Sequence, residues 1–407
     1  MLGMGFLAVS LSGRELSHPV TAPRPLSIDH PYRKTGVPPV RVLLADASGR
    51  SATIRVDGPY RVHPVGGWQT LAEGDKLASQ SVEVLPYGFR IGGSEFRVTR
   101  LEIEPLRHPT LWVGGNLYRG TLRLIRQSDG ALSAINVVDL EDYIASMVNG
   151  ETPAEFPREA RRAQAIAGRT YVLYQMKTLG RDREYDVFDD VRSQVYDGVQ
   201  HRSGGRLVAA ESADGRAIAD ETRGVVAVYR GRLFCAYYSA ICGGETIEGR
   251  QVFGDETPAV LARVPCRWCE GSKFYRWSAD IPRRTLEDNL RRNLRARGTT
   301  VGPVRRFIPL GSDAGTGRAG TIQIVSAGGQ VTLTARDFRL HSELTSQLKS
   351  DRFTLDDRGK TVHFEGRGWG HGVGLCQWGA RGQASAGRDC IGILQYYYPG
   401  SELVAVY

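Results

Sequence analysis

The sequence lacks several features that would place it in a particular class of protein. It has no run of about 20 apolar residues, the length a helix needs to cross a bilayer, so no transmembrane helix is expected. Its lysines and arginines are scattered and form no long basic run, which argues against a nucleic-acid-binding tail. No repeat recurs at a fixed period, so a repeat architecture is not expected.

A basic segment is also missing before the apolar run in residues 1–13, where a secretory signal normally has one. Two interpretations stay open for this run. It is either the remnant of a signal or the start of a disordered leader, which the Pro-rich segment from His18 to Pro39 would continue. Residues 1–39 are therefore expected to be a leader, disordered or left from a signal.

The composition is that of a soluble globular protein, with 407 residues, 41% hydrophobic and 24% charged, enough for two or three packed units. Its 49 glycines fall in turn-like clusters between short β-branched runs, which predicts many strands. The net charge of +9 favours a polyanionic partner, such as nucleic acid, anionic lipid or a cell-wall polymer. Because no recognition motif accompanies the charge, nucleic acid is not expected.

The order of the predicted elements indicates an α+β fold. Strands are expected between residues 40 and 98 and between 111 and 138, most clearly over 118–125. Asp139 suits the N-cap of a helix over 140–148, and Pro157 opens a longer helix to about 179. Further helices are expected over 206–222 and 283–297, and strands over 225–229, 233–238 and 301–331.

The long helix has small side chains at Ala160, Ala163 and Ala167, which predict close packing on a partner. Gln164 and Arg169 fall on its other flanks, available for polar contacts. Residues 40–130 are predicted to form a β-rich domain and residues 131–407 a mixed core.

Three segments contain the side chains best suited to catalysis or ligand binding. The first joins Leu140-Glu-Asp-Tyr143, Gly150-Glu151-Thr-Pro153 and Ala163-Gln-Ala-Ile-Ala-Gly-Arg-Thr-Tyr171. The second is Tyr237-Tyr-Ser-Ala-Ile-Cys-Gly-Gly-Glu-Thr246, followed by Phe253-Gly254. The third is Gly366-Arg-Gly-Trp-Gly-His371-Gly-Val-Gly-Leu-Cys-Gln377-Trp-Gly-Ala380, followed by Tyr396-Tyr-Tyr-Pro-Gly400.

Together these segments resemble the SpoIID/LytB domain family, over roughly residues 40–407. The family's signature has a short "LE-Y" helix, a Glu-x-Pro turn and a helix reading "AQAxAxRTY", each present here in order. Thr152 stands where the family usually has Met, while Glu151 and Pro153 are retained. The resemblance implies a mixed SpoIID-type catalytic core with a β-rich N-terminal or inserted domain.

The resemblance also implies an activity, with Glu151 as the catalytic residue. Cleaving a glycosidic bond requires an acid that can protonate the leaving oxygen. A hydrolase usually needs a second carboxylate, whereas a lytic transglycosylase can use one residue as acid and then as base. The expected enzyme is a peptidoglycan lytic transglycosylase, a carbohydrate-active lyase. It would cut the MurNAc–GlcNAc bond to leave 1,6-anhydro-MurNAc ends, on glycan without stem peptides, and no catalytic cofactor is expected.

Simpler interpretations exist for the acidic residues. Taken without the family match, Glu151 is more typical of a helix-terminal carboxylate that caps backbone amides. Glu155 is interpreted as a solvated residue in the first turn of the long helix.

By family position, substrate contacts are predicted at Gln164, Arg169, Tyr171, Gln194, Tyr196, Ser239, His371 and Gln377. Core packing is an open alternative for the two tyrosines. The glycines that flank His371 favour a close backbone approach there, which a core histidine would not need.

The six cysteines allow three arrangements. Cys266 and Cys269 form a C-x-x-C pair, and we predict a structural Zn²⁺ held by Cys242, Cys266, Cys269 and Cys376. Disulfides in an oxidising envelope and isolated buried thiols are the alternatives.

The resemblance places the protein in the bacterial cell envelope, outside the cytoplasm, in the periplasm or cell wall. Peptidoglycan glycan is the expected partner, and the expected biological role is in sporulation or in general wall remodelling. The alternative hypothesis is a non-catalytic, LytB-like wall-binding protein that modulates an amidase.

Overall fold

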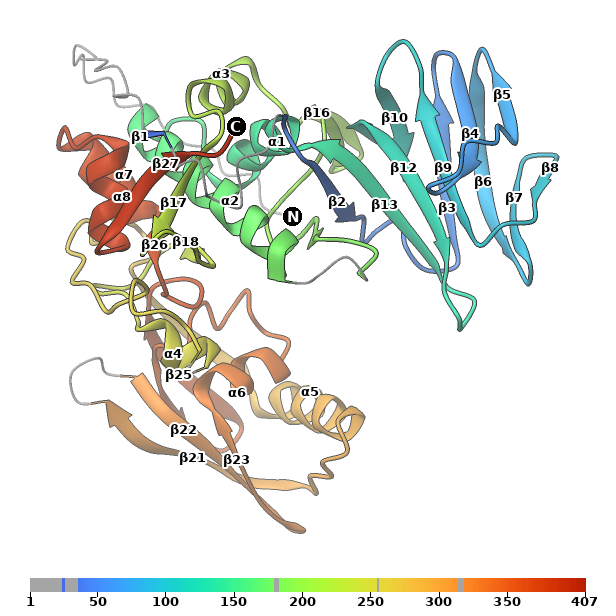
Figure 1. Ribbon diagram of the computed structural model, residues 1–407. Helices are drawn as coiled ribbons and strands as arrows, with labels where there is room; N and C mark the ends of the chain where they lie inside the picture. The colour runs from blue at the N-terminus through green and yellow to red at the C-terminus, as the bar shows by residue number, and fades with distance from the viewer. Residues whose placement is uncertain (1–23, 26–35, 179–182, 255, 314–317) are drawn as a thin grey trace. The chain divides into compact units, whose positions relative to one another are not determined.

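The computed structural model describes residues 24–25, 36–178, 183–254, 256–313 and 318–407 (Figure 1). Most of the leader predicted over residues 1–39 lies outside the described residues. The chain divides into two compact units, one with the residues up to Cys235 and Leu403–Tyr407, the other with Ala236–Glu402. The second unit is thus an insertion in the sequence of the first. Helices and strands are both abundant, so the predicted α+β class is confirmed.

Two sheets build the β-rich part of the first unit. One has the strand order β14 (Val187–Phe188), β2 (Pro39–Leu43), β13 (Leu132–Asp139), β12 (Thr121–Arg126), β9 (Arg100–Pro105), β4 (Tyr60–Pro64) and β5 (Ala72–Gly74). The other has the order β16 (Arg206–Ala209), β15 (Gln200–Ser203), β11 (Asn116–Arg119), β10 (Thr110–Val113), β3 (Ser51–Val56), β6 (Leu77–Leu85), β7 (Gly88–Ile91) and β8 (Ser94–Phe96). Burial alternates along β3, as expected for a strand with one buried face.

The strand predicted over 118–125 is broken at Gly120, so β11 and β12 belong to different sheets. Gly120 has a φ of 79°, and a Cβ at this position would overlap the carbonyl oxygen of Val137. Only glycine accommodates both conditions. The boundary predicted between residues 130 and 131 lies in the turn between β12 and β13, which pair with each other along their length.

The first unit has three described helices: α1 (Leu140–Glu151), α2 (Arg158–Thr178) and α3 (Ala213–Glu221). Asp139 caps α1 as predicted, because its side chain accepts the N–H of Glu141 at 2.8 Å. Ala160, Ala163 and Ala167 are buried, which confirms the close packing of α2.

The helix predicted over 206–222 is wrong in its first half. Residues 206–209 form the exposed strand β16, and the helix α3 begins only after Ser212, whose side chain accepts the N–H of Gly215. An apolar run of four residues does not by itself distinguish a strand from a helical turn.

The last strand, β27 (Ser401–Ala405), lies between β1 (Arg24–Pro25) and β17 (Val225–Tyr229), and β18 (Arg232–Leu233) follows β17. Val404 and Val406 share a buried cluster with Val226 and Val228. Residues 403–407 are therefore part of the core of the first unit.

The second unit contains two described antiparallel sheets. One has the order β20 (Arg276–Pro282), β25 (Thr361–Arg367) and β24 (Phe353–Asp357), and the other β21 (Val304–Asp313), β22 (Arg318–Ser326) and β23 (Gly329–Thr334). The helices α5 (Arg283–Ala296) and α6 (Ala335–His341) share with them a core that includes Leu286, Leu290, Phe338 and Phe364. The predicted helix over 283–297 is confirmed.

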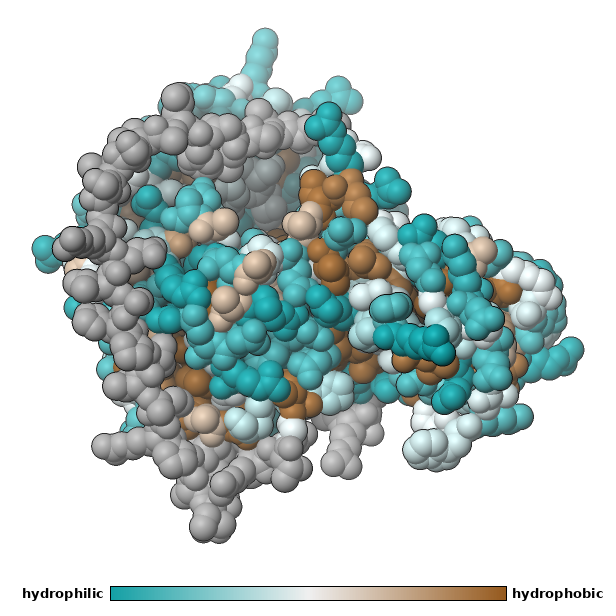
Figure 2. Space-filling model, turned by 90° about the horizontal axis from the view of Figure 1, so that it is seen from above, coloured by the Kyte–Doolittle hydropathy of each residue, from teal (hydrophilic) through white to brown (hydrophobic). Residues whose placement is uncertain are grey.

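A parallel pair of short strands joins two of the sequence motifs. β19 (Tyr238–Ser239) pairs with β26 (Leu375–Cys376), which leads into α7 (Gln377–Ser385) and α8 (Cys390–Tyr397). α4 (Gly249–Phe253) follows β19 in sequence. The face seen in Figure 2 is mostly hydrophilic over the described residues, with apolar side chains in smaller groups.

Candidate functional site

Glu151 is the last residue of α1 and is partly exposed. Thr152 has extended backbone angles, as expected for the residue before Pro153. The N–H and the hydroxyl of Thr152 both donate to the carbonyl oxygen of Val148, at 3.0 and 2.6 Å. These bonds satisfy the last turn and fix the point at which α1 ends. Glu151 is therefore held at a defined break between two helices.

Glu151 is bonded to the backbone of a loop that is distant in the sequence. Its Oε1 accepts the N–H of Val195 at 2.8 Å. Glu151 does bond a backbone amide, as the simpler interpretation predicted, but that amide belongs to a loop 44 residues away.

Two glycines allow this loop to approach the helices. A Cβ on Gly150 would lie 2.8 Å from Cγ1 and 2.9 Å from the carbonyl oxygen of Val195. A Cβ on Gly168 of α2 would overlap the end of Met147 and lie 3.2 Å from Nε2 of Gln194. The absence of a side chain at both positions thus sets the distance between the loop and Glu151.

Gln194 and Tyr196 lie in this loop, but both are buried, with 0% and 2% exposure. Gln194 accepts a hydrogen bond from the hydroxyl of Tyr143 at 3.0 Å. Tyr196 stacks on Tyr143 with ring centroids 4.8 Å apart and donates to Asn136 at 2.8 Å. Both side chains therefore anchor the loop to Tyr143 and Asn136 and do not face solvent.

Tyr171 of α2 lies close enough to Glu151 for an electrostatic effect. Burial raises the pKa of Tyr171, and the negative charge of Glu151 adds to the rise. Burial likewise raises the pKa of Tyr143, with further contributions from Tyr171 and Glu151. Both phenols therefore stay protonated near neutral pH, and the hydroxyl of Tyr143 donates to Gln194.

Arg169 does not lie on a polar flank of α2, as expected from the sequence, but is fully buried. Its Nε and Nη2 donate to the carboxylate of Glu141 at 2.9 and 2.7 Å, and Nη1 donates to the carbonyl oxygen of Val225. Tyr407 and the N–H of Gly224 also donate to Glu141. Gln164 is likewise buried, with 1% exposure. Arg169 thus joins α1 and α2, and Tyr407 of residues 403–407 bonds the same carboxylate.

The remaining predicted contacts belong to the second unit. Ser239 pairs with Cys376 across β19 and β26, and Gln377 is the first residue of α7. His371 is partly exposed, and its Nδ1 accepts the N–H of Val373 at 3.0 Å. The neutral ring therefore carries its proton on Nε2.

The glycines around His371 serve the close approach predicted from the sequence. A Cβ on Gly370 would lie 2.9 Å from Cβ of Ser239, and one on Gly372 would lie 2.7 Å from Cδ1 of Ile247. A Cβ on Gly374 would overlap the carbonyl oxygen of Tyr237. The last two motifs are thus packed backbone to backbone.

Two aromatic residues that the sequence analysis did not predict as site residues, Tyr237 and Phe253, contact the ring of His371. Tyr237 stacks on Phe253 with ring centroids 3.8 Å apart and an angle of 7° between the planes. The ring of His371 meets Phe253 at 5.2 Å and Tyr237 at 5.8 Å, edge to face. The Arg336 guanidinium lies 5.0 Å from the centroid of Phe253. The sequence did hold a signal for this group, because Tyr237 and Phe253 both belong to the motif segments that resemble the family.

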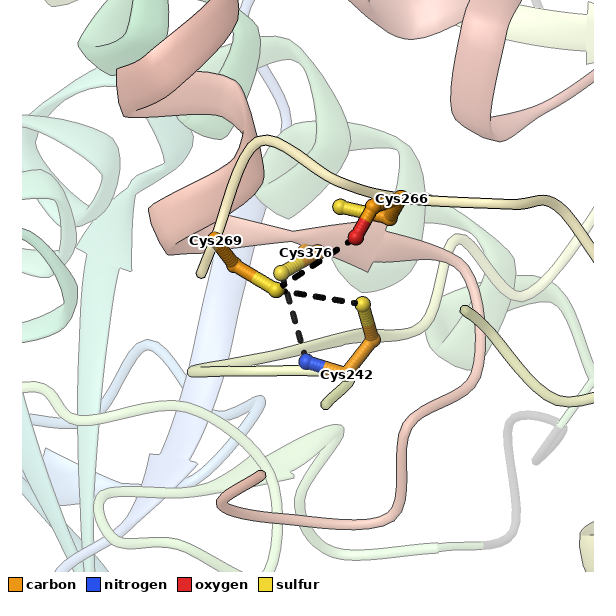
Figure 3. Close-up of side chains that lie close together, drawn as sticks. All are labelled: Cys242, Cys266, Cys269 and Cys376. Atoms are coloured by element: carbon orange, nitrogen blue, oxygen red, sulfur yellow. Dashed lines mark hydrogen bonds between the residues drawn. The ribbon is translucent and has the colours of Figure 1, made fainter. Parts of the chain in front are cut away.

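The four cysteines predicted to bind zinc converge, as Figure 3 shows. The sulfur atoms of Cys242, Cys266, Cys269 and Cys376 are buried and lie within 4.8 Å of one another. The sulfurs of Cys242 and Cys269 are 3.6 Å apart. Four thiolates around one Zn²⁺ with bonds of about 2.3 Å would have sulfurs about 3.8 Å apart. All six cysteines of the chain are free thiols in this structure.

The surroundings of the cluster also suit a metal. The N–H groups of Cys242 and Gly379 both point at the sulfur of Cys376, at 3.3 Å. The hydroxyl of Tyr397 is 3.1 Å from the sulfur of Cys266. A Cβ on Gly379 would lie 2.8 Å from that sulfur, so a side chain here would fill the space beside it. Donors that surround thiolates in this way are typical of a metal's outer shell.

The comparisons with known proteins agree with these motifs. Residues 128–229 match the family described as stage II sporulation protein, SpoIID. The chain is 30% identical over 366 residues to an uncharacterized protein of Brachyspira hyodysenteriae, covering 90% of this chain and 92% of that protein. It is 26% identical over 281 residues to stage II sporulation protein D of Bacillus subtilis, covering 67% of this chain and 76% of that protein. The chain belongs to the SpoIID/LytB family.

This SpoIID/LytB protein also resembles the amidase enhancer of Bacillus subtilis, with 24% identity over 305 residues, 64% of this chain and 40% of that protein. The SpoIID match contains Glu151, Tyr171 and the loop that bonds Glu151. Residues 259–374 match a domain of unknown function. In the described part of the chain, no helix is long and apolar enough to cross a membrane. The family assignment makes this a cell-wall-related protein.

Proposed function

We propose that this SpoIID/LytB protein is a lytic transglycosylase that cuts the MurNAc–GlcNAc bond of peptidoglycan, with Glu151 as acid and base. The observation that carries the proposal is the position of Glu151. Glu151 is partly exposed at the break between α1 and α2, and one of its carboxylate oxygens accepts the Val195 N–H. Tyr171 and Tyr143 lie within electrostatic range of it.

The reaction needs one residue that first gives and then takes a proton. Glu151 would protonate the glycosidic oxygen as the bond to C1 of MurNAc breaks. The resulting carboxylate, supported by the Val195 N–H, would remove the proton from the C6 hydroxyl of the same sugar. The C6 oxygen then bonds C1 to form the 1,6-anhydro ring, and no water is consumed.

The other predicted residues are assigned by their surroundings. Tyr171 and His371 are proposed as substrate contacts, each within its own unit. Tyr171 is 7% exposed and lies near Glu151, and His371 is partly exposed. Ser239 and Gln377 remain candidates in the second unit. Gln164, Arg169, Gln194 and Tyr196 are the most deeply buried of the set, at 0–2% exposure, and would act by holding the active-site elements in place.

We also propose that Cys242, Cys266, Cys269 and Cys376 hold a structural Zn²⁺. The ion would join three chain segments that are far apart in sequence. Four thiolates leave no open position for water or substrate, so this zinc would stabilise the fold and would not take part in the reaction.

The test compares the purified protein with its Glu151→Gln variant on peptidoglycan from which an amidase has removed the stem peptides. Gln keeps the shape of the side chain but cannot deliver a proton. Mass spectrometry is expected to find anhydro-muramyl products with the wild type, and at least about 1000-fold less with the variant. Glu155→Gln is the matched control, because Glu155 is an exposed neighbour and should be dispensable. Products with reducing-end sugars would instead identify a hydrolase.

The likeness to an amidase enhancer supports one alternative, a non-catalytic protein that binds wall glycan and modulates an amidase. Binding without product release by the wild type would favour it. Either function places the protein outside the cytoplasm, in the cell envelope, where its polymer lies.

A further inference from the structure

One surface of the second unit combines aromatic and basic side chains that the proposed chemistry does not use. All of them lie in residues 259–374, the segment that matches a domain of unknown function. We call it the aromatic–basic surface, and its members are Lys273, Phe274, Tyr275, Arg276, Lys349, Arg367 and Trp369. None of these described residues is buried.

Two aromatic rings form the centre of this surface. Phe274 and Trp369 meet edge to face with ring centroids 4.9 Å apart. The ammonium of Lys349 lies 5.1 Å from the Trp369 ring and 5.8 Å from Phe274, and that of Lys273 lies 4.9 Å from Phe274. The two rings and the two ammonium groups thus form one partly exposed group, which offers a ligand both an apolar face and positive charge.

The backbone holds these side chains in place. Trp369 exchanges two hydrogen bonds with Ile241, at 2.8 and 3.1 Å, and Gly370 donates to the carbonyl oxygen of Lys349 at 2.8 Å. Gly368 donates to the carbonyl oxygen of Tyr275 at 3.0 Å. The surface is therefore built on paired backbone segments, and a ligand would not have to order it.

The charges on this surface are arranged at a cost to the fold. Arg276 and Arg367 are direct partners across β20 and β25, and both are exposed. Like charges in directly opposite positions destabilise a sheet. Within the described residues neither arginine, nor Lys349, forms an ion pair. Two acidic groups are close by: Glu270 acts on Tyr275, and Glu365 lies two residues before Arg367 on the same face of β25. The four basic members of the surface outnumber these two acidic groups.

We propose that the aromatic–basic surface binds a saccharide that carries carboxylates. The rings of Trp369 and Phe274 would stack on sugar faces, and Arg276, Arg367 and Lys349 would bind the carboxylates. The ligand class rests on the proposed function, because a protein that acts on peptidoglycan meets glycan strands whose MurNAc residues carry lactyl carboxylates once the stem peptides are removed. The segment of unknown function would then be a glycan-holding module.

Single-stranded nucleic acid is the other polymer that aromatic and basic side chains can bind. The saccharide is favoured here because the same chain carries the SpoIID match. Nucleic acid is therefore an outcome of the test and not a second proposal.

The test measures binding by isothermal titration calorimetry with the full chain carrying Glu151→Gln, so that no turnover occurs. The probes are soluble peptidoglycan strands without stem peptides and neutral chito-oligosaccharides of equal length. Adding Arg276→Gln and Arg367→Gln is expected to weaken binding of the acidic strands about tenfold at low salt and to change binding of the neutral ones less than about twofold. Adding Trp369→Leu instead is expected to weaken both about tenfold.

A matched control removes two other exposed arginines of the same unit, Arg284 and Arg295 of α5, by substitution with Gln. Equal loss of binding in this control would show a general charge effect and overturn the proposal. So would unchanged binding in the Arg276 and Arg367 pair, or displacement of the strands by equimolar single-stranded DNA.

Thermal unfolding separates binding from a structural role. Removing the opposed arginines relieves a repulsion, so the melting temperature should stay equal or rise while binding falls. A lower melting temperature with unchanged binding would assign the arginines to the fold. Cleavage by the wild type is measured in a separate experiment. A negative binding result therefore leaves the Glu151 proposal standing, and a negative cleavage result leaves the binding result interpretable.

Discussion

Arg169 and Glu141 form a buried ion pair between α1 and α2, with Arg169 at 0% and Glu141 at 1% exposure. Replacing Arg169 with Met would leave the Glu141 carboxylate buried without its partner. The variant is expected to lose about 3–5 kcal/mol in the free energy of unfolding of the first unit. Urea denaturation checks this value. A second variant, Arg169→Met with Glu141→Gln, should recover most of the loss, and a single variant that loses under about 1 kcal/mol would contradict the assignment.

The pH dependence of the same pair provides an independent control. Burial would raise the pKa of Glu141, but the charge and hydrogen bonds of Arg169 outweigh it, so the pKa is lowered in the folded protein. A lowered pKa means that the stabilisation is fully present above the pKa of the unfolded chain, about 4.3. It is lost as the pH falls further toward the folded value. The stability difference between the wild type and the double variant should therefore shrink below about pH 4.

At the scale of residues, the sequence placed Glu151 in a turn after a helix over 140–148, whereas α1 runs to Glu151 itself. The sequence could not place the partners of the polar residues around it. Arg169 meets a carboxylate 28 residues away, and Gln194 meets a hydroxyl 51 residues away. A polar residue between buried alanines is equally compatible with solvent and with a buried partner. The spacing therefore predicted exposed flanks where the structure has pairs.

At the scale of elements, the contact between α1 and the loop around Val195 depends on Gly150. Alanine in place of glycine inside a helix usually stabilises it by about 0.5–1 kcal/mol. Here the added Cβ would lie 2.8 Å from Val195, so Gly150→Ala should displace the loop and lower cleavage roughly tenfold or more. The rate of product release from glycan checks this. Gly93→Ala is the control, because a Cβ there meets no atom within 4 Å, and an equal effect of both changes would refute the steric argument.

Elements with strong end signals were predictable, and elements that depend on remote contacts were not. The Asp139 cap and the break before Pro153 located α1, and leucines at helical spacing located α5. The break at Gly120 depends on the carbonyl oxygen of Val137, which belongs to another strand. No local pattern carries that information.

At the scale of the whole molecule, the resemblance predicted the α+β class and the family, while the division into units follows from long-range pairing. β2 pairs with β13 across more than 90 residues, and Tyr407 bonds Glu141 from 266 residues away. Such contacts hold residues 403–407 and the chain up to Cys235 in one unit, with Ala236–Glu402 in the other. The composition of the chain does not reveal these long-range contacts, because the residue types of a segment do not show to which of the two units it belongs.

The proposed zinc predicts that the two units respond differently to metal removal. Cys242, Cys266, Cys269 and Cys376 all belong to the second unit, so a chelator should lower its melting temperature by about 10 °C or more and leave the first unchanged. Calorimetry with metal analysis checks this, with one zinc per chain expected. Cys269→Ser should lose the metal, while Cys390→Ala, a buried cysteine outside the cluster, should keep it. Full stability without metal, lost on adding a reductant, would instead establish disulfides.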